Sequence, residues 1–203
     1  ITCLHDAAVS ASTLHLLHRL FGEGRLRLRV YAMLHGEEVL GEALPLGPQV
    51  GLYGGLLTVR AVKVFVDGAL GSRGAALLAP YRDAPGESGL LLMDEEAIAQ
   101  AAGRALSHGF QVCSHAIGDR AVRETVRAYR RLREAFPEVA GARLRVEHAQ
   151  VVHPADLAAF GDLTLIASIQ PTHATTDMRW AASRLGPERL AGAYAWRSLR
   201  KAG

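Results

Sequence analysis

The chain has 203 residues, of which 49% are hydrophobic and 21% charged, and its formal net charge is +3. This composition suits a folded domain with a proper core, and it excludes a disordered tail or a coiled coil. The apolar runs are far too short for a membrane span, and no signal-peptide pattern opens the sequence. We therefore expect a cytoplasmic protein that has no membrane partner.

Charge and cysteine usage narrow the class of protein further. All cationic residues except Lys63 and Lys201 are arginine, and many of the arginines fall within residues 119–135 among glutamates. Few aromatic residues accompany them, so the pattern indicates a solvated helix face and no nucleic-acid partner. Cys3 and Cys113 show neither metal-type nor disulfide-type spacing, which favours buried thiols in a reducing compartment.

Short β-rich runs alternate with helical patterns along the whole chain. Helices are predicted over residues 12–21, 94–108 and 119–135, and a further helix begins at Pro154. Asp94 is placed to cap the second of these, and Gly109 is placed to end it. Strands are predicted over residues 1–5, 27–34, 59–66, 111–115, 143–148 and 163–170.

Strict alternation of strands and helices predicts a parallel α/β sheet, either doubly wound or closed as a (β/α) barrel. No glycine-rich nucleotide-binding motif follows any of the predicted strands, which argues against the doubly wound alternative. In a barrel, the polar chemistry gathers at the carboxyl ends of the strands. Polar residues stand at these positions, namely His5, Asp6, Asp67, His115, His148, Gln170 and His173. Residues 68–92 form a long glycine-rich connection, which we interpret as an active-site loop.

Lys63 is the most informative single residue of the sequence. It lies within the apolar run Val62–Val66, where strand geometry places Lys63, Phe65 and Asp67 on one face and the valines on the other. Burial would lower the pKa of this lysine and make its amine nucleophilic. Two chemistries use such an amine: a Schiff base with a carbonyl substrate, or a carbamate that ligates a metal ion.

His115 and His148 each close a predicted strand. Neutral imidazoles at the ends of sequential strands are natural ligands for zinc or a similar divalent ion. Together with an inward-pointing Lys63, the two histidines favour a metal site over two unrelated core residues.

Taken together, several segments resemble amidohydrolase family 3, the YtcJ-like metal-dependent hydrolases. The resemblance begins with the lysine-bearing strand and its loop and runs through both histidine segments. It continues through two later segments, so that it covers essentially the whole chain. The matching segments are VKVFVDGALGSRGAAL (62–77), SHAIGDRAV (114–122), RVEHAQ (145–150), QPTHATTDM (170–178) and AYAWR (193–197).

The resemblance implies part of a TIM barrel that hydrolyses carbon–nitrogen bonds other than peptide bonds, with an amide-type small molecule as substrate. Metal-activated water would attack the substrate. Lys63 would be carboxylated and would bridge two divalent ions, zinc being the expected metal, while His115 and His148 would be further ligands. The resemblance also implies that Arg73, His173 and Asp177 line the substrate site.

The chain also departs from the family pattern. The H-x-H pair that the family takes from its first strand and the aspartate of its last strand are both absent. Residues 1–203 would then form a single, partial catalytic barrel domain, a fragment with about strands two to seven of the eight, in which one or two ions belong to the full-length parent. Open sheet edges make association into a homo-oligomer an expected outcome.

Two other interpretations stay open at this point. Lys63 could form the Schiff base of a lyase, with His115 as its proton shuttle. Alternatively, the chain could be a non-catalytic module that associates through its open sheet edges.

Overall fold

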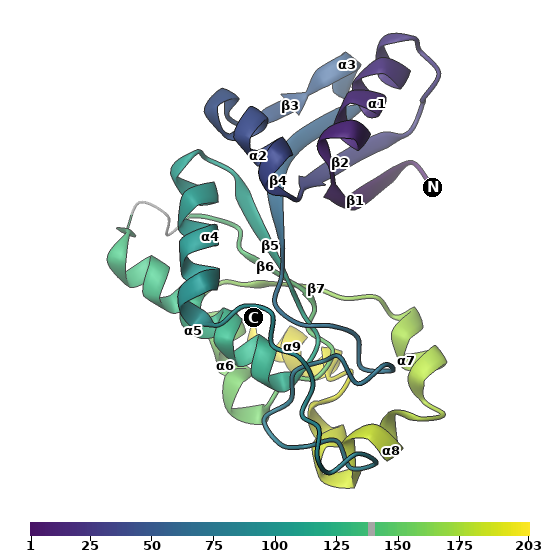
Figure 1. Cartoon of the computed structure of the whole chain (residues 1–203), viewed down its shortest axis with the longest axis vertical. Coiled ribbons are helices and arrows are strands. Elements are labelled where there is room, and N and C mark those ends of the chain that lie inside the picture. The colour runs from purple at the N-terminus through teal and green to yellow at the C-terminus, as the bar shows by residue number, and fades with distance from the viewer. Residues whose placement is uncertain (138–140) are drawn as a thin grey trace. The chain divides into compact units, whose positions relative to one another are not determined.

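The computed structural model describes residues 1–137 and 141–203 of the chain (Figure 1). Parallel strands alternate with helices, as the sequence predicts. The strands are β1 (Cys3–Val9), β2 (Arg29–Leu34), β3 (Gln49–Gly51), β4 (Leu57–Phe65), β5 (Gln111–Ala116), β6 (Arg145–His148) and β7 (Ile166–Ser168). The α-helices are α1 (Ala11–Gly22), α2 (Glu37–Ala43), α3 (Leu52–Gly55), α4 (Glu95–Ser107), α5 (Asp119–Ala135), α6 (Ala158–Asp162), α7 (Thr172–Asp177), α8 (Ala181–Leu185) and α9 (Trp196–Ala202), and short 3₁₀ turns cover Leu44–Leu46, Pro154–Asp156 and Pro187–Gly192.

Hydrogen-bonded neighbours follow one another in the order β1-β2-β4-β5-β6-β7. β2 is parallel to β1 and β4, and β6 is parallel to β7. The sequence analysis missed β3, which pairs antiparallel to β4 through Gln49 and Val59. Gly47, two residues before β3, and Gly51, its last residue, both have φ +72° and let the chain reverse within a few residues. The three residues of β3 are too few to show a period.

The first and last strands differ most from the predicted bounds. The first strand extends to Val9, beyond the predicted residue 5, and a bulge at Ala8 (φ +73°) interrupts its register with β2. The last strand is only Ile166–Ser168, because Leu163 and Thr164 donate their backbone N–H groups to Ala159 and Gly161 and so complete the end of α6. Both cysteine thiols were predicted to be buried. Cys113 is buried, but the prediction for Cys3 is wrong, because Cys3 is exposed.

The chain divides into two compact units, which are described separately. Unit 1 comprises residues 1–64 and 102–113, and unit 2 comprises residues 65–101 and 114–203. A single domain over residues 1–203 stays a prediction. In unit 1, Ser10 caps α1 by accepting a hydrogen bond from the Thr13 backbone N–H at 3.3 Å, and the helix buries Leu14, Leu17 and Phe21.

The core of unit 2 is built in large part from the long connection between β4 and α4. Leu70, Ala75, Leu77 and Tyr81 of this connection are buried together with residues of the β5–α5 and β6–α6 turns and of α8, namely Ile117, Val151 and Leu185. Asp94 caps α4 as predicted, accepting from the Ala97 backbone N–H at 2.9 Å. The connection is therefore a packed part of the fold.

None of the helices in the described part of the chain combines the length and the apolar character needed to cross a bilayer.

Candidate functional site at the strand ends of unit 2

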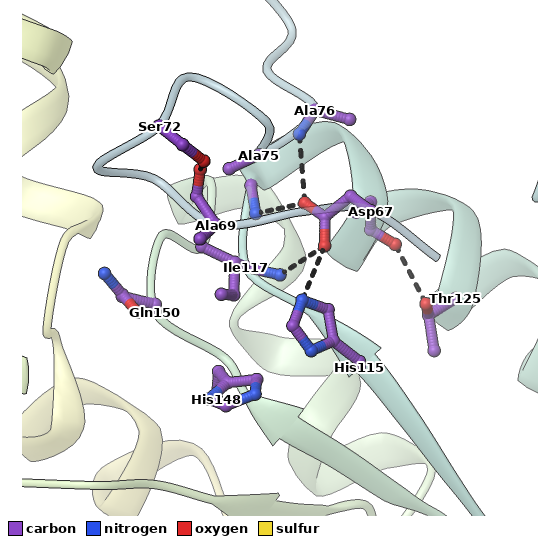
Figure 2. A network of polar contacts seen from close by, with 12 residues as sticks. Asp67, Ala69, Ser72, Ala75, Ala76, His115, Ile117, Thr125, His148 and Gln150 are labelled. Atoms are coloured by element: carbon purple, nitrogen blue, oxygen red, sulfur yellow. Dashed lines mark hydrogen bonds and ion pairs between the residues drawn. The ribbon is translucent and has the colours of Figure 1, made fainter. Parts of the chain in front are cut away.

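Asp67, two residues beyond the end of β4, anchors the long connection. Its buried carboxylate accepts hydrogen bonds from the backbone N–H groups of Ala76, Ile117 and Gly118 at 2.9, 3.0 and 2.8 Å (Figure 2). These partners lie in the connection itself and in the turn that leads from β5 into α5. One side chain therefore joins two segments that are far apart in the sequence.

Two glycines let these segments approach each other closely. A Cβ atom at Gly89 (φ +85°) would overlap the carbonyl oxygen of Ala75, and one at Gly118 would overlap that of Ala76. The fully buried Tyr81 adds a hydrogen bond from its hydroxyl to the Ala75 carbonyl at 2.7 Å. Backbone packing therefore requires one glycine of the glycine-rich connection, Gly89, and also Gly118 in the turn before α5.

His115 and His148 lie side by side at the ends of β5 and β6. Their ring centroids are 4.5 Å apart in an edge-to-face arrangement (Figure 2). His115 Nε2 lies 3.5 Å from Oδ1 of the Asp67 carboxylate. His148 and Ala149 both have positive φ, +76° and +41°, so the chain accepts local strain where β6 ends.

A glutamine fixes the proton of His148. Its Nδ1 lies 2.6 Å from Gln170 Oε1, while Gln170 Nε2 donates to the Ser168 carbonyl at 3.4 Å. Since the amide oxygen can only accept, the proton of a neutral His148 ring lies on Nδ1 and the lone pair on Nε2. Metal-binding histidines are commonly oriented by such a bond from the other ring nitrogen.

His173 extends this pair into a row of three rings. It stacks on His148 with centroids 5.5 Å apart and planes 17° apart, and its Nδ1 lies 3.1 Å from Gln150 Oε1. Gln150 is buried and also contacts Asp177 and Tyr194. Burial and the hydrogen bond to Asp177 raise the pKa of Tyr194 well above its ordinary value, so its hydroxyl stays protonated.

The two remaining predicted site residues are Arg73 of unit 2 and Lys63 of unit 1. Arg73, in the connection after β4, forms a bidentate pair with Asp83 (3.2 and 3.1 Å), and Arg184 contacts the same carboxylate. Lys63 is 3% exposed within β4 and belongs to unit 1, where its carbonyl group lies 3.0 Å from His35 Nδ1. The roles predicted for Arg73 and Lys63 stay predictions.

Sequence reasoning placed His115, His148, His173 and Asp177 in the site, and the structure brings all four into one continuous row of ring contacts and hydrogen bonds. It missed the orienting role of Gln150 and Gln170 and the part played by Tyr194. The one available signal was position, because Gln150 and Gln170 each stand two residues beyond the end of a strand.

A divalent ion fits the donors of this row. Imidazole nitrogen, which His115 and His148 both supply, is the type of ligand that zinc and related ions bind. Across residues 1–137 and 141–203, no three His, Cys, Asp or Glu side chains are grouped as a complete metal site. The assignment of His115 and His148 as metal ligands therefore stays a prediction.

Known proteins match this chain over most of its length. The amidohydrolase family model matches residues 1–203. YtcJ of Bacillus subtilis (strain 168) is 34% identical over 139 residues, which cover 68% of this chain and 26% of YtcJ. The protein LONG AFTER FAR-RED 3 of Arabidopsis thaliana is 38% identical over 144 residues, or 70% of this chain and 24% of its own length.

Among solved structures, an uncharacterized metal-dependent hydrolase from Pyrococcus furiosus matches all of this chain and 41% of its own, with 34% identity and a TM-score of 0.87. The chain thus spans about a quarter of the length of the curated relatives that it matches. The strand order and this match confirm the predicted fold class, a partial TIM barrel of parallel strands alternating with helices.

Proposed function

The chain belongs to the amidohydrolase family, and on that premise we propose that the protein is a metal-dependent hydrolase of carbon–nitrogen bonds other than peptide bonds, such as those of amides. The observation that carries the proposal is the paired arrangement of His115 and His148, with ring centroids 4.5 Å apart and a polar partner for each ring. Metal-dependent hydrolysis is also named for the relative from Pyrococcus furiosus.

His115 and His148 would hold the metal ion, for which we propose zinc because imidazole nitrogen suits it. When bound, a divalent ion lowers the pKa of water and polarises the substrate carbonyl. Asp67 lies beside the His115 ring, and Gln170 holds the proton of His148 on Nδ1. The carboxylated Lys63 implied by the family resemblance remains part of this proposal on sequence grounds alone.

The substrate would lie beside His173, which stacks on His148. An amide presents a carbonyl oxygen and, in most cases, an N–H group, and neutral imidazole can accept a hydrogen bond from the N–H. Arg73 and Asp177 are retained as proposed substrate-site residues, although the Arg73 guanidinium is paired with Asp83 and the Asp177 carboxylate accepts from Gln150 and Tyr194.

The first test is the metal content of the full-length protein, measured by elemental analysis after purification without added metal. We expect near-stoichiometric divalent metal in the wild type and a loss of that metal in His115→Ala, His148→Ala and Lys63→Ala. His108→Ala is the matched control, because the ring of that exposed histidine contacts Ser107 and the Arg104 carbonyl, away from the histidine row. Equal metal content in all five proteins would refute the proposed ligands.

Activity is then assayed on a panel of N-acyl, formamide and cyclic amide substrates. We expect turnover that a chelator abolishes and that added divalent metal restores. Metal-independent turnover, or trapping of Lys63 by borohydride with a carbonyl substrate, would contradict the hydrolase and support Schiff-base chemistry instead.

A further inference from the structure

The His173 side chain has a hydrogen-bond partner that neither of the proposed metal ligands shares. Its ring stacks on His148, and its Nδ1 points away from that ring contact toward Gln150 Oε1 at 3.1 Å. The inference below rests on the proposed function in one respect, since it takes the row of histidines as the place where substrate binds.

The orientation of the Gln150 amide is determined by its other partners. Gln150 Nε2 lies 2.9 Å from Asp177 Oδ2 and 3.2 Å from the Tyr194 hydroxyl oxygen. A carboxylate can only accept, so it requires the amide nitrogen on this side. Both amide hydrogens are then used, and the group that Gln150 turns toward His173 is its carbonyl oxygen.

Tyr194 completes the arrangement. Its hydroxyl donates to Asp177 Oδ2 at 2.8 Å, so the tyrosine oxygen accepts from Gln150. The Tyr194 backbone N–H also donates to the main-chain carbonyl of Gln150 at 2.7 Å. The φ of Tyr194 is +52°, a conformation that costs a non-glycine residue free energy. Gln150 and Asp177 are 4% and 9% exposed, so few water molecules can compete with these bonds.

We propose that Asp177, Tyr194 and Gln150 are positioning residues that keep the proton of neutral His173 on Nδ1, so that Nε2 presents a lone pair to the substrate. Gln150 Oε1 accepts the Nδ1–H bond, and Asp177 and Tyr194 prevent the amide from turning over. The nitrogen that remains is an acceptor, which fits a substrate with a hydrogen-bond donor. The preferred substrates are therefore amides that retain an N–H on the scissile nitrogen.

The tautomer can be read directly from long-range ¹⁵N–¹H spectra of the full-length protein labelled at histidine, with the imidazoles neutral and no metal added. The His173 signals are assigned by their loss in His173→Ala. We expect the Nδ1–H pattern in the wild type and a shift to Nε2–H in Gln150→Leu, where Nδ1–H loses its acceptor. Thermal unfolding confirms that each variant is folded.

Two substitutions at Asp177 test whether Gln150 needs Asp177 in order to keep the His173 proton on Nδ1. Asp177→Asn keeps a carbonyl oxygen that can accept from both Gln150 and Tyr194, so the Nδ1–H pattern should persist. Asp177→Ala removes that acceptor and frees the Gln150 amide to turn over, so the Nε2–H pattern should appear. An Nε2–H pattern in the wild type, or an Nδ1–H pattern in Gln150→Leu or Asp177→Ala, would overturn the proposal.

The substrate consequence is tested with matched secondary and N,N-dialkylated amides. A lost hydrogen bond should lower kcat/KM of the wild type by about tenfold for the dialkylated amide, and Gln150→Leu should lose this preference. Equal hydrolysis by the wild type would overturn the substrate class. The expected tautomer pattern without hydrolysis of any amide would instead count against the proposed function, so the two failures can be told apart.

Discussion

The connection after β4 and the connections after β6 and β7 all belong to unit 2, yet they are held by different kinds of bond. After β4, the Asp67 carboxylate accepts three backbone N–H groups and so fixes the path of the chain. After β6 and β7, Gln150 and Gln170 hold imidazole rings by side-chain bonds. The bonds of Asp67 mainly support the fold, whereas those of the two glutamines mainly orient the imidazole rings of the candidate site.

The largest expected effect is on stability, from Asp67→Ala. This substitution leaves three backbone N–H groups without their acceptor in a buried place, which should lower the free energy of unfolding by about 3–5 kcal/mol. Urea unfolding of the full-length protein measures the change. Asp83→Ala in the same connection is the control, because Asp83 accepts only from arginine side chains near the surface and should cost less than about 1 kcal/mol. Similar losses in the free energy of unfolding for both variants would show that Asp67 stabilises the fold no more than the surface carboxylate of Asp83 does.

A smaller effect, on metal binding, is expected from Gln170→Leu. Without the acceptor for its Nδ1–H, His148 is no longer held in one tautomer, and metal affinity should fall about 10- to 100-fold. The free energy of unfolding should change by less than about 1.5 kcal/mol, because one hydrogen bond is lost. Titration with a competing chelator measures the affinity, and Gln100→Leu, on the exposed surface of α4, is the control. Unchanged affinity in Gln170→Leu would show that the amide does not orient the ring.

The smallest effect appears only in alkaline solution and concerns Tyr81. Burial, together with the nearby Asp67 carboxylate, raises the pKa of Tyr81 to about 12. An unfolded chain would release this proton near pH 10, so the folded form binds it more tightly between about pH 10 and 12. The free energy of unfolding should therefore fall as the pH rises through this window, and Tyr81→Phe should show a shallower fall. Parallel slopes for the two proteins would contradict this assignment.

Local patterns predicted the long helices because their cause lies within each segment, whereas the short helices α2, α3, α7, α8 and α9 were not predicted. Residues 119–135 form α5 with the predicted bounds, and the helix buries Ala121, Val122, Val126 and Tyr129 on one face. The strand β3 was missed because it depends on a turn and on a partner strand. Its three residues carry no period of their own.

The candidate site also depends on partners that are distant in the sequence. Histidines at strand ends are visible in the sequence because barrels place their chemistry there. Gln150 also stands just beyond a strand, but its partners are 23, 27 and 44 residues away, and a buried glutamine has no characteristic neighbours in the sequence. Its role follows only from which atoms face each other, and that is a property of the fold.

The bonds of Asp67 also have a consequence for the order of events during synthesis. Two of its N–H partners, Ile117 and Gly118, lie 50 and 51 residues further along the chain. During synthesis Asp67 is therefore made before the turn that it will bind, and its carboxylate stays hydrated until that turn has been made. The segment between β4 and α4 can reach its final path only after the start of α5 exists, although it is made first.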